Sequence, residues 1–201
     1  MGEKKQRHGS TVAGIVLAAG DSERFPEPKQ LLHWKGKALV WHAVRAALEG
    51  GLEPVVVVTG ADADDVRAVL AEESVEFVHN PDWVSGQSTS MHAGLDAVRD
   101  AAEAVVMLLS DMPLVDAKLI RALVSAHRES HAAIVAPRAK GRRGNPVLFT
   151  RATYPELDAV EGDRGGRKLI GSLFTEWVDW DDSALQDIDY DEDWERLRGE
   201  G

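Results

Sequence analysis

The stretch that decides the fold runs from Val12 to Leu32 and reads "VAGIVLAAGDSERFPEPKQLL". Val12–Ala19 is short and apolar and is followed by Gly20, which predicts a buried strand that ends in a turn. Pro26 and Pro28 oppose a helix directly after this turn, because proline breaks a helix interior. The stretch also lacks the G-x-G-x-x-G fingerprint of dinucleotide-binding folds and the G-x-x-x-x-G-K-[ST] phosphate loop. What remains is a turn of small residues that leads into a polar loop.

The residues of this loop suit an anionic ligand. Ala18, Ala19 and Gly20 are small, so the backbone can approach a ligand closely. Arg24 and Lys29 follow, five positions apart. Backbone N–H groups together with two cations favour a polyphosphate cradle. The alternative at this point is a solvated loop with incidental charges.

Apolar patterns along the rest of the chain predict strands that alternate with helices. The predicted strands after the first are Pro54–Gly60, Val75–His79, Ala104–Leu109, Ala132–Ala136, Asn145–Phe149 and Trp177–Trp180. The predicted helices are Ala38–Glu49, Asp62–Ala71, Ser88–Asp100, Asp116–Ser130 and Arg164–Leu173, with a final helical turn at Asp193–Gly199. This alternation favours an α/β fold of three layers, Rossmann-like, with a mainly parallel sheet and helices on both faces. Ligands of such folds bind beyond the carboxyl ends of the strands.

Length and composition set the broad class of protein. A chain of 201 residues suits one domain, which we expect to span residues 12–201 after a flexible tail at 1–11. The absence of cysteine excludes disulfides and thiolate sites, so we expect a reducing cytoplasm. No stretch has the length of a transmembrane helix, and the start has no apolar core of a signal peptide. A net charge of -11 disfavours nucleic acid, and an anionic substrate needs a local positive site.

Two aspartates are candidates for a metal site. Asp111 lies in "LLSDMP", at the carboxyl end of the predicted strand Ala104–Leu109, where a ligand site of this fold is expected. Asp163 lies in "EGDRGGRKL" and offers a second carboxylate. Mg²⁺ prefers oxygen ligands and is usually held by one or two carboxylates together with substrate phosphates. The alternative for each residue is a cap or turn aspartate.

Two further polar stretches are candidates for substrate contacts. Asn80–Leu95 reads "NPDWVSGQSTSMHAGL", and its small polar groups lead into a helix, where they can meet an anion, a base or a ribose. Its alternative is an N-cap, which Ser88 alone can provide. Gly141–Phe149 reads "GRRGNPVLF", and its arginines can close over an anionic second substrate or can belong to a plain β-turn.

Taken in order, these stretches resemble one family, the MobA-like nucleotidyltransferases, and within it the molybdenum cofactor cytidylyltransferases. The family pattern is approximately LAAGxSxRMGxxKxLL, NPxWxxGQSxSLxxGL, LxDMP, GxRGHPVLF and GDxGAR. The corresponding segments here are Leu17–Leu32, Asn80–Leu95, Leu109–Pro113, Gly141–Phe149 and Gly162–Arg167. The chain departs from the pattern with Phe25-Pro26 in place of Met-Gly, Met91 in place of Leu, Asn145 in place of His and Gly166 in place of Ala.

This resemblance implies an α/β domain like the nucleotide-diphospho-sugar transferases. The implied reaction transfers CMP from CTP to the phosphate of molybdopterin and releases pyrophosphate. Arg24 and Lys29 would then bind the β- and γ-phosphates, and Asp111 and Asp163 would hold Mg²⁺. The implied nucleotide pocket consists of Leu17, Ala18, Ala19, Gly20, Gln87 and Ser88, and the implied acceptor site includes Arg143 and Asn145.

Three other functions stay open at this point. The first is transfer from GTP, or to a different acceptor, within the same fold; GTP-using relatives more often carry LAGG where this chain has LAAG, and they lack GQSxS. The second is a non-catalytic protein that delivers the cofactor to a molybdenum hydroxylase. The third is a nicotinamide-dependent oxidoreductase, which the missing glycine fingerprint disfavours.

Overall fold

The computed structural model describes residues 11–22, 25, 27–163, 166 and 169–199. The expected tail, residues 1–11, lies outside this range except for Thr11, and the division of the chain into a tail and one domain stays a prediction. The strands of the main sheet are β1 (Val12–Ala18), β4 (Val55–Thr59), β5 (Glu76–His79), β6 (Ala104–Leu109), β7 (Ile134–Ala139), β8 (Arg142–Arg143), β9 (Val147–Thr150) and β10 (Thr175–Asp179). A separate hairpin is formed by β2 (His33–Trp34) and β3 (Lys37–Ala38). The helices are α1 (Leu39–Glu49), α2 (Ala63–Val69), α3 (Gln87–Val98), α4 (Ala117–Ser130), α5 (Tyr154–Asp158) and α6 (Asp191–Gly199).

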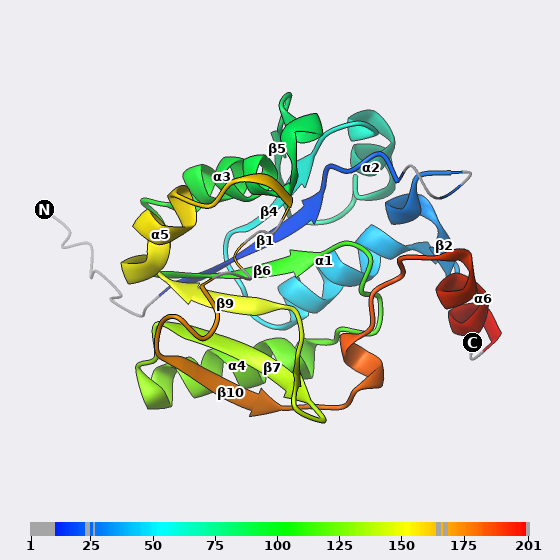
Figure 1. The fold of residues 1–201 in the computed structure, drawn as a ribbon. Helices are drawn as coiled ribbons and strands as arrows, with labels where there is room; N and C mark the ends of the chain where they lie inside the picture. Colours follow the sequence, from blue (N-terminus) through cyan, green and yellow to red (C-terminus); the bar gives the residue numbers. More distant parts are fainter. Residues whose placement is uncertain (1–10, 23–24, 26, 164–165, 167–168, 200–201) are drawn as a thin grey trace, which may run out of the picture.

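The main sheet is mostly parallel, as the alternating pattern predicts. Its strand order is β10-β7-β9-β6-β1-β4-β5, and β8 pairs with β7 (Figure 1). β6, β1, β4 and β5 run parallel to one another, and so do β7 and β10. β9 lies between β6 and β7 and is antiparallel to both. The predicted fold class, a Rossmann-like α/β fold with a mainly parallel sheet, is therefore confirmed.

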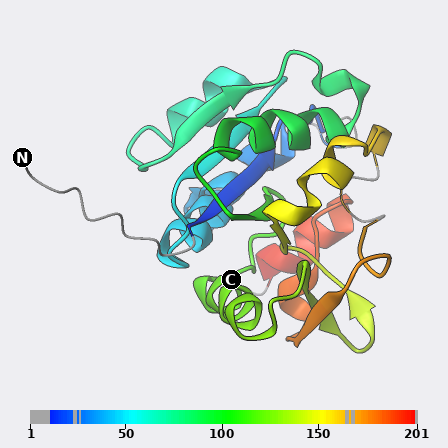
Figure 2. The same ribbon diagram turned by 90° about the vertical axis from the view of Figure 1, so that its left-hand side faces the viewer.

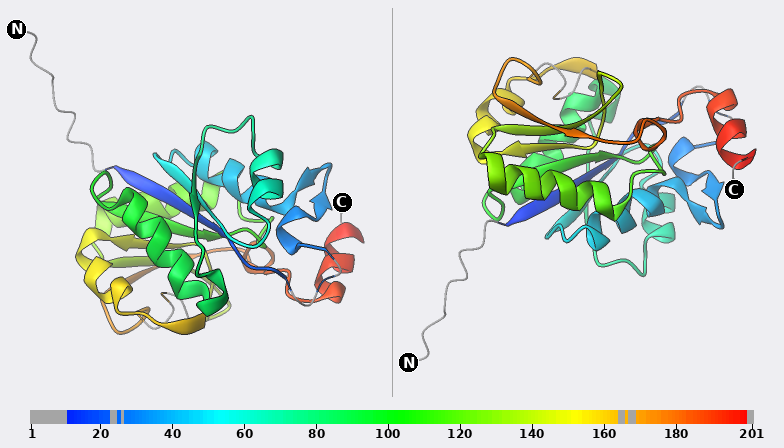
Figure 3. Two further views of the ribbon diagram at one scale, coloured as in Figure 1. Left: turned by 90° about the horizontal axis from the view of Figure 1, so that it is seen from above. Right: turned by 90° about the horizontal axis from the view of Figure 1, so that it is seen from below.

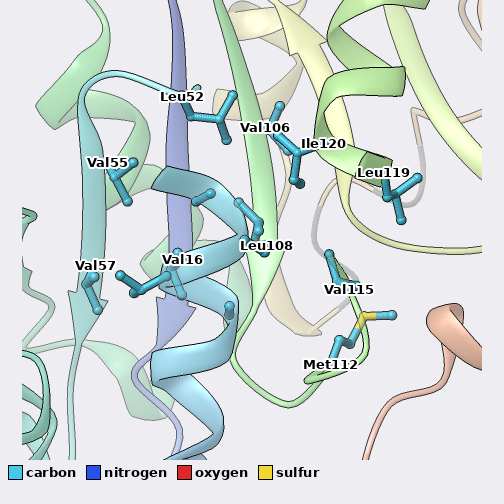
Figure 4. Packing of buried hydrophobic residues seen from close by; sticks show 14 of the residues in the cluster. Val16, Leu52, Val55, Val57, Val106, Leu108, Met112, Val115, Leu119 and Ile120 are labelled. Carbon is cyan, nitrogen blue, oxygen red and sulfur yellow. The ribbon is translucent and has the colours of Figure 1, made fainter. Parts of the chain in front are cut away.

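Helices cover both faces of this sheet. α1 and α4 pack on one face, and α3 packs on the other along β1 and β4 (Figures 2 and 3). Figure 4 shows part of the first layer, where Val16, Val57 and Leu108 of three neighbouring strands meet apolar side chains that include Ile120 of α4. Because β1 and β4 are buried on both faces, their sequences are almost entirely apolar.

The packing of α3 depends on a glycine. A Cβ atom built on Gly94 would lie 2.4 Å from Cγ2 of Ile15 and 2.9 Å from Cγ2 of Val58. A side chain at this position would therefore push α3 away from β1 and β4. This close approach fixes where the first turn of α3 lies relative to the carboxyl edge of the sheet.

The last helix closes one end of the molecule. α6 lies beside the hairpin of β2 and β3 (Figures 1 and 3). Trp34 of the hairpin and Leu197 of α6 belong to one small apolar cluster, together with Leu32, Leu39 and Ile188. The C-terminal segment is thereby anchored near the carboxyl ends of β1 and β6.

The structure corrects parts of the predicted element list. Of the predicted helix Arg164–Leu173, residues 164–165 and 167–168 lie outside the described residues. Its end, Leu169–Leu173, is a turn with an isolated bridge between Ile170 and Leu173. Ser172 Oγ donates to the Leu169 carbonyl, and such side-chain bonds compete with helix continuation. The predicted helical turn at Asp193–Gly199 is the second part of α6. In the part of the chain that the structure describes, no helix is long and apolar enough to cross a membrane.

Candidate active site

An open cleft of about 460 Å³ lies beyond the carboxyl ends of β1 and β6. The two strands are neighbours in register, with Leu17 opposite Leu109, and the Ser110 N–H donates to the Leu17 carbonyl over 3.2 Å. The loop after β1 and the turn after β6 therefore meet at one edge. The residues that line the cleft are Leu17, Ala18, Ala19, Gly20, Asp21, Ser22, Lys29, Gln30, Trp83, Val84, Gly86, Gln87, Ser90, Leu109, Ser110, Asp111 and Asp163.

Gln30 holds the loop after β1 in place. Its side chain is buried, and its Nε2 donates to the Gly20 carbonyl and to Asp62 Oδ2, each over 3.0 Å. Its Oε1 accepts a hydrogen bond from Ser22 Oγ over 3.0 Å. Ser22 Oγ in turn accepts from the Lys29 N–H over 2.9 Å. These bonds fix the position from which Lys29 reaches into the cleft.

Lys29 and Asp111 form an ion pair inside the cleft. Lys29 Nζ lies 2.7 Å from Asp111 Oδ2, and each side chain is only 17% exposed. Burial lowers the pKa of Lys29, but the carboxylates of Asp111 and Asp189 outweigh it, so that the net pKa is raised and Lys29 stays protonated. The other oxygen, Asp111 Oδ1, is buried without a hydrogen-bond partner among the described residues. Such an orphaned carboxylate oxygen is unusual and fits a ligand that binds there.

The C-terminal segment adds two carboxylates that the sequence analysis missed. Lys29 Nζ lies 3.2 Å from Asp189 Oδ1. The Ile188 N–H donates to the Asp111 carbonyl over 3.0 Å, so the segment runs directly beside the turn after β6. Burial raises the pKa of Asp187, and the negative charges of Asp189 and Asp111 raise it further. Residues 186–189 belong to no helix or strand, so no periodic pattern in the sequence marks these two carboxylates.

The first turn of α3 forms another wall of the cleft. Asn80 is buried, and its Nδ2 donates to Thr89 Oγ1 over 2.8 Å and to Ser90 Oγ over 3.0 Å. Gln87 and Ser90 line the cleft. Ser88, which the resemblance places in the nucleotide pocket, is 3% exposed and is not among the lining residues. Of the predicted nucleotide residues, Leu17, Ala18, Ala19, Gly20 and Gln87 line the cleft.

Asp163 lines the same cleft as Asp111 and lies beside the start of α3. Gly86 has a φ of +110°, a conformation that L-residues rarely adopt. A Cβ atom there would lie 2.7 Å from Asp163 Oδ1 and 2.9 Å from the carbonyl carbon of Gly162. The carboxylate of Asp163 therefore packs against the backbone of Gly86. Arg24, the other predicted phosphate ligand, lies outside the described residues.

A second cavity adjoins the first near the predicted acceptor residues. It has a volume of about 260 Å³, and Arg143, Asn145 and Asp187 are among its lining residues. A narrow space of about 30 Å³, lined by Asn145 and Gln87 among others, lies between this cavity and the cleft. Asp182 pairs with Lys140 and Arg142 of the hairpin that carries Arg143. The two predicted substrate sites are thus neighbours.

The arrangement suits a phosphate ester together with a hard cation. Asp111 and Asp163 line the cleft, and Lys29 provides a fixed positive charge. Within the described residues, no three His, Asp or Glu side chains converge on one point as a complete metal site. Ligands from a substrate would have to complete the coordination, as is usual for Mg²⁺ with nucleotides.

Comparisons with known proteins agree with this picture. The model of the MobA-like NTP transferase domain matches residues 14–177. Nicotine blue oxidoreductase of Paenarthrobacter nicotinovorans is 32% identical over 197 residues, which cover 92% of this chain and 96% of that protein. The bifunctional protein GlmU of Anaeromyxobacter sp. (strain K) is 34% identical over 181 residues, which cover 81% of this chain but only 36% of that protein.

A solved structure extends the similarity to nearly the whole fold. Rv0371c from Mycobacterium tuberculosis H37Rv, in its complex with manganese, has a TM-score of 0.83 and 27% sequence identity. The match covers 96% of this chain and 100% of that chain. Because the family model spans most of the described sheet and a relative of nearly equal length is 32% identical, the chain belongs to the MobA-like NTP transferase domain family.

Proposed function

We propose that this protein transfers CMP from CTP to the terminal phosphate of molybdopterin and releases pyrophosphate. The observation that carries the proposal is the pair of Lys29 and Asp111 at the head of a cleft, with Asp111 Oδ1 buried and unpaired among the described residues. The neighbouring cavity beside Asn145 has room for a second substrate. The cytidine base and the molybdopterin acceptor come from the sequence resemblance.

The residues of the cleft fit a divalent metal ion. We propose that Asp111 and Asp163 hold Mg²⁺, which would neutralise charge on the triphosphate. The unpaired Asp111 Oδ1 supports this role, because a buried carboxylate oxygen without a donor is costly unless a ligand binds it. The manganese complex of Rv0371c is consistent with metal use in a relative.

The protein's own groups would act mainly by position and charge. In the proposed reaction, an oxygen of the acceptor phosphate forms a bond to the α-phosphorus of CTP while the bond to the β-phosphate oxygen breaks. Lys29 would hold the departing pyrophosphate, and by resemblance Arg24 would share this role. The backbone from Ala18 to Gly20 would lie against the phosphates. Phosphoryl-type transfer of this kind needs little more than orientation and charge neutralisation.

The experiment measures pyrophosphate release with each of the four NTPs, molybdopterin and Mg²⁺. We expect release with CTP and its loss in the variant Asp111→Asn. Asp100→Asn is the matched control, because it removes the same charge at an exposed residue before β6, at the opposite edge of the sheet. A preference for GTP would refute the cytidylyl assignment, and full turnover by Asp111→Asn would refute the proposed role of Asp111. No pyrophosphate release by the unchanged protein with any of the four NTPs would favour a delivery protein.

Reduction of a dye-like substrate is the second candidate function. One observation favours it: the relative that is 32% identical over nearly its whole length is a nicotine blue oxidoreductase. Against it, the turn after β1 lacks the glycine pattern that brings a dinucleotide onto a helix N-terminus. Titration with NADH and NADPH, followed by nicotinamide fluorescence, separates the two functions. Saturable binding of either cofactor together with no NTP binding would replace the transferase proposal.

A further inference from the structure

Lys29 is shared by two carboxylates from distant parts of the chain. Its Nζ lies 2.7 Å from Asp111 Oδ2, after β6, and 3.2 Å from Asp189 Oδ1, just before α6. Asp189 is 44% exposed, while Lys29 and Asp111 are each 17% exposed. An ammonium group that bonds to two carboxylates neutralises each of them less than it would neutralise one alone. The distribution of Lys29 between the two therefore sets how much negative charge Asp111 keeps.

The segment that carries Asp189 is held at several points. Ile188 is buried in the cluster between the β2–β3 hairpin and α6, and its N–H donates to the Asp111 carbonyl. Asp193 Oδ2 accepts hydrogen bonds from the N–H groups of Asp189, over 3.2 Å, and Tyr190, over 3.1 Å. These contacts fix the backbone of Asp189 beside Lys29. Its contact with Lys29 is therefore a built feature of the fold.

Asp189 contacts Lys29 but is not one of the residues that line the cleft. Lys29 and Asp111 both line it. Asp187 lines the neighbouring cavity on the acceptor side. A ligand in the cleft thus meets Lys29 and Asp111 directly, and Asp189 can influence it through Lys29.

We propose that Asp189 is a positioning residue, which draws Lys29 Nζ partly away from Asp111 and so keeps the Asp111 carboxylate available to a divalent cation. The proposal rests on the proposed function, in which Asp111 binds the metal. Without Asp189, Lys29 pairs with Asp111 alone and competes more strongly with the cation. Without Lys29, this competition disappears and Asp189 loses its influence.

A double-mutant cycle on Mn²⁺ affinity tests this mechanism, measured by electron paramagnetic resonance of free Mn²⁺ without nucleotide. We expect Asp189→Asn to weaken Mn²⁺ binding about three- to tenfold in the otherwise unchanged protein. We expect Lys29→Gln to strengthen Mn²⁺ binding. In the Lys29→Gln background, Asp189→Asn should change the affinity by less than about twofold. Asp189→Glu, which restores the carboxylate, should bind Mn²⁺ nearly as well as the unchanged protein.

The controls separate this mechanism from simpler ones. Asp191→Asn removes the same charge from an exposed neighbour in α6 and should leave Mn²⁺ affinity within about twofold of the unchanged protein. Circular dichroism confirms that each variant is folded. An equal loss from Asp189→Asn in both backgrounds would overturn the proposal, because Asp189 would then act on the metal directly. No loss in either background would overturn it as well. If Asp111→Asn leaves Mn²⁺ binding unchanged, the metal site of the proposed function is wrong, whatever Asp189 does.

Discussion

Replacing Gly86 by alanine tests how the start of α3 and Asp163 shape the cleft. Gly86 has φ +110° and ψ 167°, a region that is essentially limited to glycine and costs other residues about 1–3 kcal/mol. The added Cβ would also lie 2.7 Å from Asp163 Oδ1 and 2.9 Å from the Gly162 carbonyl carbon. The Asp163 side chain can turn away, but the Gly162 contact is with backbone. Relief therefore requires the loop at Gly162 to move and to carry Asp163 with it.

The expected result combines a loss of stability with a loss of ligand binding. The backbone strain at residue 86 and the steric contact of the new Cβ atom should together lower the free energy of unfolding by about 2–4 kcal/mol. For a domain of this size, each kcal/mol lowers the melting temperature by about 2–4 °C, so we expect a fall of about 5–15 °C. Because Asp163 moves, the affinity for Mn²⁺ with CTP should fall by about tenfold or more, which corresponds to about 1.4 kcal/mol for one lost ligand interaction. Differential scanning fluorimetry and Mn²⁺ titration measure the two effects.

Gly51→Ala is the matched control for this experiment. Gly51 also has a positive φ, +84°, but a Cβ atom there would meet no atom within 4 Å. It lies in the turn after α1, away from the residues that line the cleft. We expect Gly51→Ala to cost about 1 kcal/mol of stability and to leave ligand binding unchanged. If Gly86→Ala behaves like Gly51→Ala in both measurements, the argued contact of Gly86 with the loop of Asp163 is refuted.

Three further changes test other parts of the structure. Gln30→Leu should lower the free energy of unfolding, measured in urea, by about 2–3 kcal/mol, because the Gly20 carbonyl and the side chains of Ser22 and Asp62 lose a buried partner. An unchanged unfolding midpoint would contradict this hydrogen-bond network. Gly94→Ala should lower the free energy of unfolding by about 1–3 kcal/mol, because the added methyl group overpacks α3 against Ile15. A higher melting temperature would contradict this packing. Asp187→Asn should stabilise the protein at neutral pH. The pKa of Asp187 in the folded protein is raised above its ordinary value of 3.8, so its ionised form destabilises the fold. The gain in unfolding free energy of the variant over the unchanged protein should therefore shrink as the pH falls toward 3.8. A difference that grows on acidification would contradict the sign of this shift.

The sequence predicts the central strands well because their signal is local. β1, β4 and β6 are short, continuous apolar runs, and each was expected within about two residues of its observed bounds. No local pattern in the sequence predicts whether β9 runs parallel or antiparallel to its neighbours. The apolar residues of Val147–Thr150 indicate a strand, but only its place between β6 and β7 makes it antiparallel. The β2–β3 hairpin was missed, because two-residue strands are too short for a periodic pattern.

The same distinction applies to the candidate site. The place of Asp111 on the cleft could be predicted because it follows a buried strand, and folds of this class bind ligands beyond the carboxyl ends of their strands. Asp189 follows no predicted element, yet it contacts Lys29 across a separation of 160 residues. That contact depends on Ile188 in the cluster between the hairpin and α6, a tertiary arrangement without a periodic signature. Ser88 shows the opposite case, since its motif placed it in the pocket, whereas the helix turns its side chain into the interior.

Under the proposed function, a strongly acidic chain must accept an anion, and the charge of the cleft suggests how it would do so. Of the described residues that line it, Lys29 is basic, while Asp21, Asp111 and Asp163 are acidic. A bare triphosphate would meet net repulsion there, and a bare cation would compete with Lys29 for Asp111. Bound together, the cation satisfies the carboxylates and the phosphates satisfy Lys29, so each ligand removes the electrostatic cost of the other. Under the proposed function, the ion pair of Lys29 with Asp111 and Asp189 would balance the charges of the site until both ligands arrive, which would make metal and nucleotide binding mutually dependent.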